Sequence, residues 1–265
     1  MSIEPHNLEA NGLMLGAPPG ALRETAHGID GTLDFERPAY PFGHRLKNCS
    51  MGAFCFFNAA GQTSAYRVRF GRYAQIGESS IIGPPEHSQT GFSNHPFAFT
   101  RPALMPNMYA LPDFAALAPD ASAGPSYTDT VRNDTVLGHE VYLGAGSFVK
   151  RGVTISDGAL IGARSVVTRD IPPYAIAFGS PARIVRLRFA DKLVERLLTL
   201  QWWRYDLAPF KSALDFTQLE PTLEKLEQLL AEGQLQDLKP DTFRVTRTGP
   251  GGLSVVALPK PLFFS

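Results

Sequence analysis

The chain has 265 residues, and its 25 basic and 25 acidic side chains cancel, which argues against a chain that binds nucleic acid or anionic lipid through its overall charge. With 44% apolar and 19% charged residues it can bury a packed core, so wholesale disorder is excluded. No stretch approaches the roughly 18 uninterrupted apolar residues of a spanning helix, and the start MSIEPHN lacks a basic segment followed by an apolar run. We therefore expect a cytoplasmic protein.

The first segment, residues 1–45, is rich in loop residues and shows no strong helix pattern. We expect it to form an N-terminal extension that covers the first turn of the domain that follows. Cys49 and Cys55, just beyond it, are six residues apart, a spacing that matches neither a redox pair nor half of a zinc site.

Residues 46–185 carry a six-residue repeat. An aliphatic or aromatic residue followed by glycine occurs at Phe70, Ile76 and Ile82, and the same phase resumes at Val131 and continues to Val167. This period matches neither a 3.6-residue helix nor a heptad. It is typical of short strands joined by tight corners, with three hexads to each triangular turn and a continuous apolar column inside. The residues four positions after each apolar site are mostly small or β-branched: Thr135, Val141, Ser147, Val153, Ala159, Ser165 and Ile171.

Two irregularities interrupt this repeat. Met51 and Phe57 are out of phase with Phe70 by one residue, which predicts a slip or bulge between them. A longer break spans residues 84–130, and an insert of that length inside a regular domain is usually functional or disordered. We expect it to be the active-site loop and to set specificity.

Helical periodicity returns in residues 186–232. Apolar residues at Leu193, Val194, Leu197 and Leu198 predict one helix, and a second helix is indicated by Phe216, Leu219, Leu223, Leu226 and Leu230. Residues 233–265 form an extended tail, in which the segments 242–248 and 253–258 predict a hairpin around residues 249–252.

The end of the repeat carries a specific resemblance. Residues 162–176 read GARSVVTRDIPPYAI, residues 179–185 read GSPARIV, and a helix with the aromatic pair Trp202 and Trp203 follows. These motifs resemble the hexapeptide-repeat acyltransferases of the xenobiotic and polysaccharide acetyltransferase group, and the similarity spans about residues 48–206. It implies a mainly β fold, a left-handed parallel β-helix, and a homotrimer that binds acetyl-coenzyme A as co-substrate between subunits.

The resemblance also implies an active site at the start of the insert. The first histidine of the family's loop is the catalytic base, and it corresponds to His87. Glu86 stands where the family usually has asparagine, so it either orients His87 or is a solvated loop charge. His95 corresponds to a position that lines the acceptor pocket, and Phe92 lies beside it in the same loop. The alternative for each is a surface or loop-packing residue.

Histidine suits this chemistry for a general reason. Acetyl transfer from a thioester needs a base that takes the proton of the nucleophile and an acid that protonates the departing thiolate. Imidazole, with an unperturbed pKa of about 6.5, can do both. Because the two cysteines lie outside the loop and no serine has the placement relative to a histidine that a nucleophile would have, we expect direct transfer in a ternary complex.

The cofactor contacts implied by the family fall near the end of the repeat. Ala145 and Ala163 are small enough to let the pantetheine arm approach the backbone. Thr168, Arg169 and Arg183 correspond to the hydroxyl and basic contacts to pantetheine and phosphates. For the arginines, the alternative is a solvated corner charge.

Tyr142 and His139 complete the candidate site. Tyr142 replaces a tryptophan common in the family and offers a flat ring for an acceptor. His139 also lies in a Gly-His stretch that looks like the zinc-binding motif of hexapeptide-repeat carbonic anhydrases. That family's next ligand would fall on Gly144, so we expect no metal and interpret His139 as a corner side chain near the acceptor.

The sequence leaves the acceptor open. The form of the loop, with His87 followed by SNHPF at residues 93–97, resembles the polysaccharide-type members, and this resemblance implies O-acetylation of a saccharide or another small-molecule acceptor. N-acetylation of an amino sugar or antibiotic is the alternative. A repeat scaffold without catalysis is the third possibility, and no nucleic acid partner is expected.

Overall fold

The computed structural model of the protein describes residues 13, 28–41, 44–58, 62–87, 92–95, 107–118, 134–249, 252–259 and 261–264. The chain divides into two compact units, residues 1–84 with 134–265, and residues 85–133.

The larger unit consists mainly of short β-strands. These are β1 (Ile29–Glu36), β2 (Arg45–Met51), β3 (Phe56–Phe57), β4 (Ser64–Tyr66), β5 (Val68–Phe70), β6 (Gln75–Ile76), β7 (Ile81–Ile82), β8 (Thr135–Leu137), β9 (Tyr142–Leu143), β10 (Phe148–Val149), β11 (Thr154–Ile155), β12 (Leu160–Ile161), β13 (Val166–Val167), β14 (Ala175–Gly179), β15 (Ala182–Leu187), β16 (Thr242–Gly249) and β17 (Gly252–Leu258).

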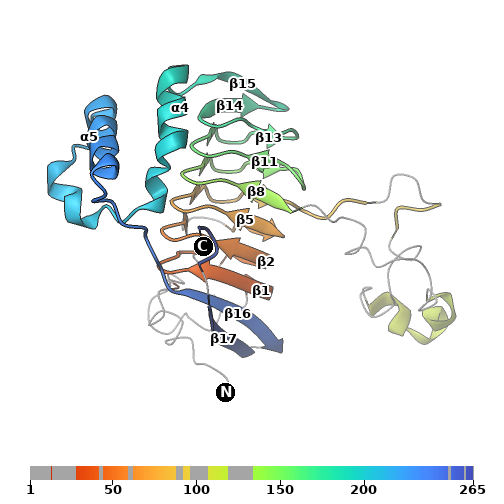
Figure 1. The fold of residues 1–265 in the computed structure, drawn as a ribbon. Helices are drawn as coiled ribbons and strands as arrows, with labels where there is room; N and C mark the ends of the chain where they lie inside the picture. The colour runs from red at the N-terminus through yellow and green to blue at the C-terminus, as the bar shows by residue number, and fades with distance from the viewer. Residues whose placement is uncertain are drawn as a thin grey trace. The chain divides into compact units, whose positions relative to one another are not determined.

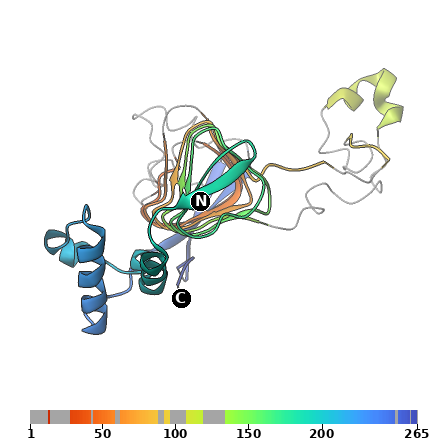
Figure 2. The same ribbon diagram turned by 90° about the horizontal axis from the view of Figure 1, so that it is seen from above.

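These strands form a parallel β-helix with three faces. β3, β6, β9, β12 and β14 stack on the first face, β4, β7, β10 and β13 on the second, and β5, β8 and β11 on the third. Figure 1 shows β2, β5, β8 and β11 one above another, and the coils have a triangular outline when seen from above (Figure 2). β2 bends at Asn48, which has a φ of 53°, and pairs with β4 before the bend and with β5 after it. The fold class expected from the repeat is confirmed.

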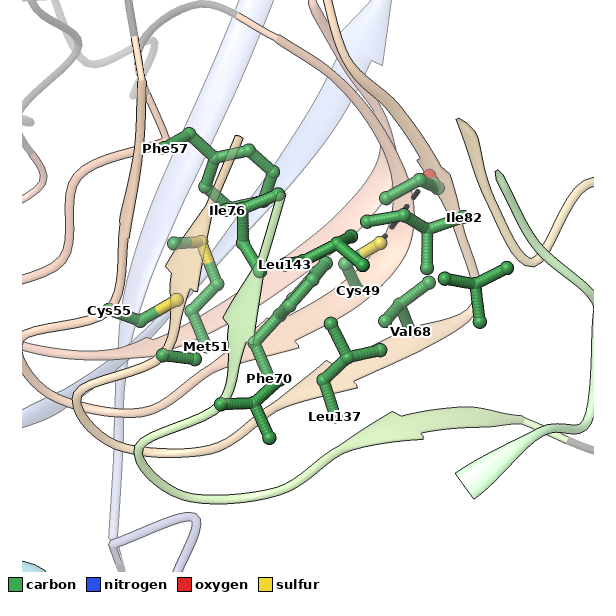
Figure 3. Packing of buried hydrophobic residues seen from close by; sticks show 14 of the residues in the cluster. Cys49, Met51, Cys55, Phe57, Val68, Phe70, Ile76, Ile82, Leu137 and Leu143 are labelled. Carbon is green, nitrogen blue, oxygen red and sulfur yellow. Dashed lines mark hydrogen bonds between the residues drawn. The ribbon is translucent and has the colours of Figure 1, made fainter. Parts of the chain in front are cut away.

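The register shows why a six-residue period builds this fold. Leu137 pairs with Ile155, eighteen residues later, so three hexads complete one coil. Every hexad position from Phe70 to Val167 that the structure describes is at most 1% exposed. Figure 3 shows five of these side chains, those of Phe70, Ile76, Ile82, Leu137 and Leu143, meeting inside the coils with Met51, Cys49 and Cys55. The small residues four positions after each hexad site are also buried, as expected, while Val131 lies outside the described residues.

Both predicted irregularities are present. Met51 pairs with Phe70, nineteen residues later, so the first coil is one residue longer than the others. Phe70 pairs in turn with Leu137, sixty-seven residues later, so the insert adds forty-nine residues without breaking the register. The insert leaves after Gly83, which has a φ of 60°. A Cβ added there would lie 2.7 Å from the Tyr66 carbonyl oxygen, so this exit requires glycine.

Additional strands cover both ends of the β-helix. At the first end, β1 pairs in parallel with β2 and antiparallel with β16, and β17 pairs with β16. The hairpin expected in the tail is therefore confirmed, and it shares the covering role with the N-terminal extension, which supplies a regular strand from Ile29. At the other end, β15 folds back on β14. Such pairing leaves fewer open strand edges for association.

Two α-helices lie beside one corner of the coils, as both views show (Figures 1 and 2). α4 (Asp191–Leu200) buries Val194, Leu197 and Leu200 against the corner residues Tyr73 and Tyr174. We call this column of corner residues, which precedes β6, β9 and β14, the helical corner. The 3-10 helices η6 (Trp202–Arg204) and η7 (Ala208–Ala213) follow α4.

α5 (Leu219–Ala231) differs in detail from the sequence expectation. It buries Leu223, Leu226 and Leu229, whereas Leu230 is 38% exposed. Phe216 precedes the helix and is 58% exposed. The apolar period is helical as predicted, with Leu223 and Leu226 buried, and only at the last turn does Leu229 take the place of Leu230. α5 packs on α4. Among the described residues, no helix is long and apolar enough to cross a membrane.

Candidate functional site

His87 belongs to the smaller unit, near the start of the insert. Its Nδ1 lies 2.9 Å from the carbonyl oxygen of Asn94. A carbonyl oxygen only accepts, so in the neutral ring Nδ1 carries the proton and Nε2 holds the basic lone pair. The side chain is exposed. This arrangement suits a base, because one ring nitrogen is oriented by the protein and the other is the proton acceptor.

The other insert residues of the candidate site lie close to His87 in sequence. Glu86 is half-buried, while Phe92 is 98% exposed and His95 is exposed. The His95 backbone N–H donates to the Ser93 hydroxyl oxygen at 3.1 Å, which tightens the turn that also presents the Asn94 carbonyl. The group seen to orient His87 is therefore a backbone carbonyl, and the orienting role of Glu86 stays a prediction. The insert also holds the 3-10 helices η4 (Asn107–Ala110) and η5 (Pro112–Leu117).

Ala145 and Ala163 lie one above the other at a corner of the β-helix, before β10 and β13. A Cβ added to Gly144 would lie 2.4 Å from the Ala163 backbone nitrogen, and one added to Gly77 would lie 2.4 Å from that of Ala145. The coils therefore stack with their backbones in direct contact along this column, which we call the alanine corner. Ala163 is exposed and Ala145 half-buried, so this corner presents a smooth wall of backbone and methyl groups.

The proposed phosphate contacts are spread over other parts of the β-helix. Thr168 and Arg169 are exposed at the corner that follows β13, the next corner along the coil after the alanine corner. Arg183 lies in β15 at the end of the first face, where it is exposed and its Nη1 donates to the Ala182 carbonyl oxygen at 3.2 Å. The structure brings Ala145 and Ala163 together, and it places the basic residues at the same end of the β-helix but on different sides.

Tyr142 projects outward from the first face. It lies in β9, between Gln75 of β6 and Leu160 of β12, and is 41% exposed. Its ring is therefore exposed on the first face, which lies between the helical corner and the alanine corner. That position is compatible with stacking on a flat ligand.

His139 lies at the helical corner within an aromatic cluster. Its ring stacks on Trp203 at 5.3 Å and on Phe264 at 5.2 Å, and its Nδ1 accepts the backbone N–H of Arg72 at 3.0 Å. Burial, with smaller contributions from Arg72 and Arg69, lowers the pKa of His139 to about 3. Its surroundings hold it as a neutral packing residue, which agrees with the corner interpretation and favours no part in proton transfer.

Neither cysteine is placed to act as a nucleophile. Cys49 and Cys55 are buried in the core, and burial raises the pKa of both thiols, to about 12 for Cys49. A thiol held protonated is a poor nucleophile. In the part of the chain that the structure describes, no three His, Cys, Asp or Glu side chains are arranged to hold a metal ion.

Sequence reasoning missed one group of residues altogether. Glu36 and Arg72 form an ion pair with both side chains fully buried, beside Trp203 and His139. Arg72 occupies a hexad corner and Glu36 ends a strand in the N-terminal extension, so neither position stands out in the repeat. Their distance in sequence leaves no local signal that could have paired them.

Comparison with known proteins gives a consistent result. No family model matches the chain. Chloramphenicol acetyltransferase of Agrobacterium fabrum is 31% identical over 178 residues, which cover 66% of this chain and 75% of that protein. The enzyme of the same name from Klebsiella aerogenes is 30% identical over 179 residues, with the same coverage.

A more distant relative and a solved structure extend this comparison. Galactoside O-acetyltransferase of Escherichia coli is 29% identical over 137 residues, or 43% of this chain and 64% of its own length. A variant of AntD, an N-acyltransferase from Bacillus cereus solved with coenzyme A and dTDP-4-amino-4,6-dideoxyglucose, superposes with a TM-score of 0.40 and 16% identity over 76% of this chain and 97% of its own.

Proposed function

This chain belongs to the hexapeptide-repeat acyltransferases, whose left-handed parallel β-helix is the fold of its larger unit, and we infer that it transfers an acetyl group from acetyl-coenzyme A to a hydroxyl of a small acceptor. The observation that carries this inference is the similarity to two chloramphenicol acetyltransferases over three quarters of their length. The hydroxyl as acceptor is also supported by the similarity to a galactoside O-acetyltransferase.

In the proposed mechanism His87 handles the proton. Its Nε2 takes the proton from the acceptor hydroxyl as that oxygen attacks the thioester carbonyl. The tetrahedral intermediate then collapses, the C–S bond breaks, and the imidazolium returns the proton to the thiolate of coenzyme A. The hydrogen bond from Nδ1 to the Asn94 carbonyl supports this role, because it orients the ring and stabilises the imidazolium while the proton is held.

The cofactor is proposed to run along the alanine corner. Ala145 and Ala163 leave room for the pantetheine arm, and the peptide groups there can pair with its amides. Thr168, Arg169 and Arg183 supply a hydroxyl and two cations for the phosphate end. We propose that the enzyme works as a homotrimer, in which the insert of one subunit meets the alanine corner of its neighbour. Tyr142, Phe92 and His95 would then contact the acceptor.

A thiol-release assay with acetyl-coenzyme A tests the proposal. We expect turnover with chloramphenicol or a galactoside, and a fall in kcat of about 10²- to 10⁴-fold in His87→Gln. His95→Gln is the matched control, since its backbone contact survives the change; we expect it to alter the KM of the acceptor and keep most of kcat. The KM of acetyl-coenzyme A should stay unchanged in both.

Three outcomes would contradict parts of this proposal. Full turnover in His87→Gln would exclude His87 as the base. Acetylation of glucosamine in preference to the hydroxyl acceptors would identify an N-acetyltransferase. Coenzyme A binding without turnover on any acceptor would indicate a scaffold.

A further inference from the structure

A cavity of about 430 Å³ lies between α4, α5 and the helical corner of the β-helix. Its volume is in the range of small-molecule sites. Leu197 and Leu200 of α4 and Leu223 and Leu226 of α5 line it with apolar side chains, and each of these leucines is at most 6% exposed. The two helices thus pack beside each other without filling the space between their apolar faces and the corner.

One end of this cavity is polar, and the two charged residues that line it, Arg188 and Glu140, form an ion pair. Arg188 donates from Nη2 to Oε1 of Glu140 at 3.0 Å and from Nη1 to the Gly158 carbonyl oxygen at 2.6 Å. Its guanidinium also lies over the rings of Tyr174 and Phe189, at 5.4 and 5.0 Å from their centroids. The arginine is therefore held by four groups of the protein, although its side chain is 23% exposed.

Only one of the two carboxylate oxygens of Glu140 accepts a hydrogen bond from the described part of the protein. Oε1 accepts from Arg188, whereas Oε2 has no hydrogen-bond donor among the described residues, and the side chain is 23% exposed. Burial raises the pKa of Glu140, and the nearby Arg188 opposes that shift. Oε2 keeps some contact with solvent through the cavity, and a donor placed there would take the place of water. A ligand that donates a hydrogen bond to Oε2 would satisfy it.

The charges at this end also select against charged ligands. A cation drawn to Glu140 would meet the guanidinium of Arg188, and an anion would meet the carboxylate of Glu140, with that of Asp157 nearby. A neutral molecule is repelled by neither charge. At the mouth of the cavity Phe216 is 58% exposed, which leaves a large apolar ring where a ligand would enter.

We propose that this cavity is a binding site for a neutral, largely apolar small molecule that donates one hydrogen bond, such as an alcohol or phenol, to Oε2 of Glu140. The site is built from the larger unit alone. It shares no residue with the alanine corner or with the insert, so it stands independently of the acetyl-transfer proposal.

Fluorescence of N-phenylnaphthylamine, a neutral apolar dye with one N–H donor, tests the site. We expect saturable binding to the full chain and a loss of affinity of roughly tenfold or more in Leu219→Trp, which fills the cavity from α5. Leu230→Trp is the matched control, because it makes the same substitution in the same helix away from the cavity, and it should bind the dye like the wild type. Far-UV circular dichroism and melting establish that both variants fold.

Competition with ligands of one chain length tests the chemical class. Decanol should displace the dye at concentrations at least tenfold lower than decanoate or decylammonium. Better displacement by either ion would overturn the assigned class. Absence of saturable dye binding, or equal binding in Leu219→Trp and wild type, would overturn the site itself. If Leu219→Trp fails to fold, Thr222→Phe, which fills the same cavity from a half-buried position, replaces it.

Discussion

The carboxylate of Glu36 and the guanidinium of Arg72 form a fully buried, bidentate ion pair, with Nε to Oε2 at 2.6 Å and Nη2 to Oε1 at 3.0 Å. Oε1 also accepts the backbone N–H groups of Leu262 and Phe263, and Nη1 donates to the carbonyl oxygen of Trp203. One pair of side chains therefore joins β1, the coil corner after β5, the segment after α4 and the C-terminal residues. A charge left alone at this point would have no water to solvate it.

We predict that Glu36→Gln lowers the free energy of unfolding by about 3 to 5 kcal/mol, because it leaves the Arg72 guanidinium buried without a counter-charge. Urea unfolding at neutral pH measures the loss. Asp237→Asn is the control, since it removes the carboxylate from the ion pair with Arg204, in which both side chains are about two-fifths exposed. That change should cost less than about 1 kcal/mol. If both variants lost the same free energy of unfolding, burial would not determine how much an ion pair contributes to stability.

His139 should make the stability depend on pH. Its pKa is lowered to about 3 in the folded protein, whereas the unfolded chain takes up a proton near pH 6.5. Its contribution is therefore complete above pH 6.5 and is lost as the pH falls toward 3, by up to about 1.4 kcal/mol per pH unit. Burial also lowers the pKa of His44, so this residue adds to the loss of stability at low pH.

His139→Asn tests this pH dependence, since the amide oxygen can still accept the Arg72 N–H. We expect lower stability at pH 7.5 from lost stacking and a flatter decline between pH 6.5 and 5, measured by urea unfolding at each pH. The wild type, unfolded in parallel at each pH, supplies the reference slope. A decline as steep in His139→Asn as in the wild type would assign the acid sensitivity to other groups.

The close stacking of coils at the alanine corner predicts a graded response to added methyl groups. In Gly144→Ala the new Cβ would lie 2.4 Å from a backbone nitrogen of the next coil, and we expect a loss of about 3 kcal/mol. In Gly162→Ala the nearest atom is the Cβ of Phe178, a 55% exposed side chain, at 2.8 Å. That Cβ is fixed to the backbone, so relief requires a shift of β14; because β14 lies in the last coil of the first face, we expect a smaller loss of about 1 to 2 kcal/mol.

Thermal melting of the two glycine variants at one protein concentration provides the comparison. A melting temperature for Gly144→Ala at or above that of Gly162→Ala would mean that the coils can separate at little cost.

Ala163→Leu tests the proposed wall for the pantetheine arm. The longer side chain would project from an exposed position at the alanine corner, so we expect the KM of acetyl-coenzyme A to rise about tenfold while the KM of the acceptor stays unchanged. Ala208→Leu, the same substitution at an exposed alanine of η7, is the control and should leave both constants as in the wild type. An unchanged KM in Ala163→Leu would remove this corner from the cofactor path.

The sequence alone determined the coil. Each hexad places one side chain inward and one glycine or small residue at a corner, so the fold is encoded locally and repeatedly, and the slip after Met51 and the break after Gly83 could be read as departures from that period. The same holds for the tail hairpin, whose two strands are joined by a short glycine-rich turn. The candidate base, His87, came from a resemblance at the same break.

Only the tertiary structure determined the contacts between segments that are far apart in the sequence. Glu36 meets Arg72 across 36 residues and Phe263 across 227, and β1 pairs with a strand more than 200 residues later. Such contacts have no period and depend on how separate elements pack. The carbonyl that orients His87 belongs to the backbone, which has no residue-specific signal. The cavity beside Glu140 is lined by residues of two helices and of a coil corner that are far apart in the sequence. Local spacing therefore encodes the β-helix, while long-range packing sets the chemistry placed on it.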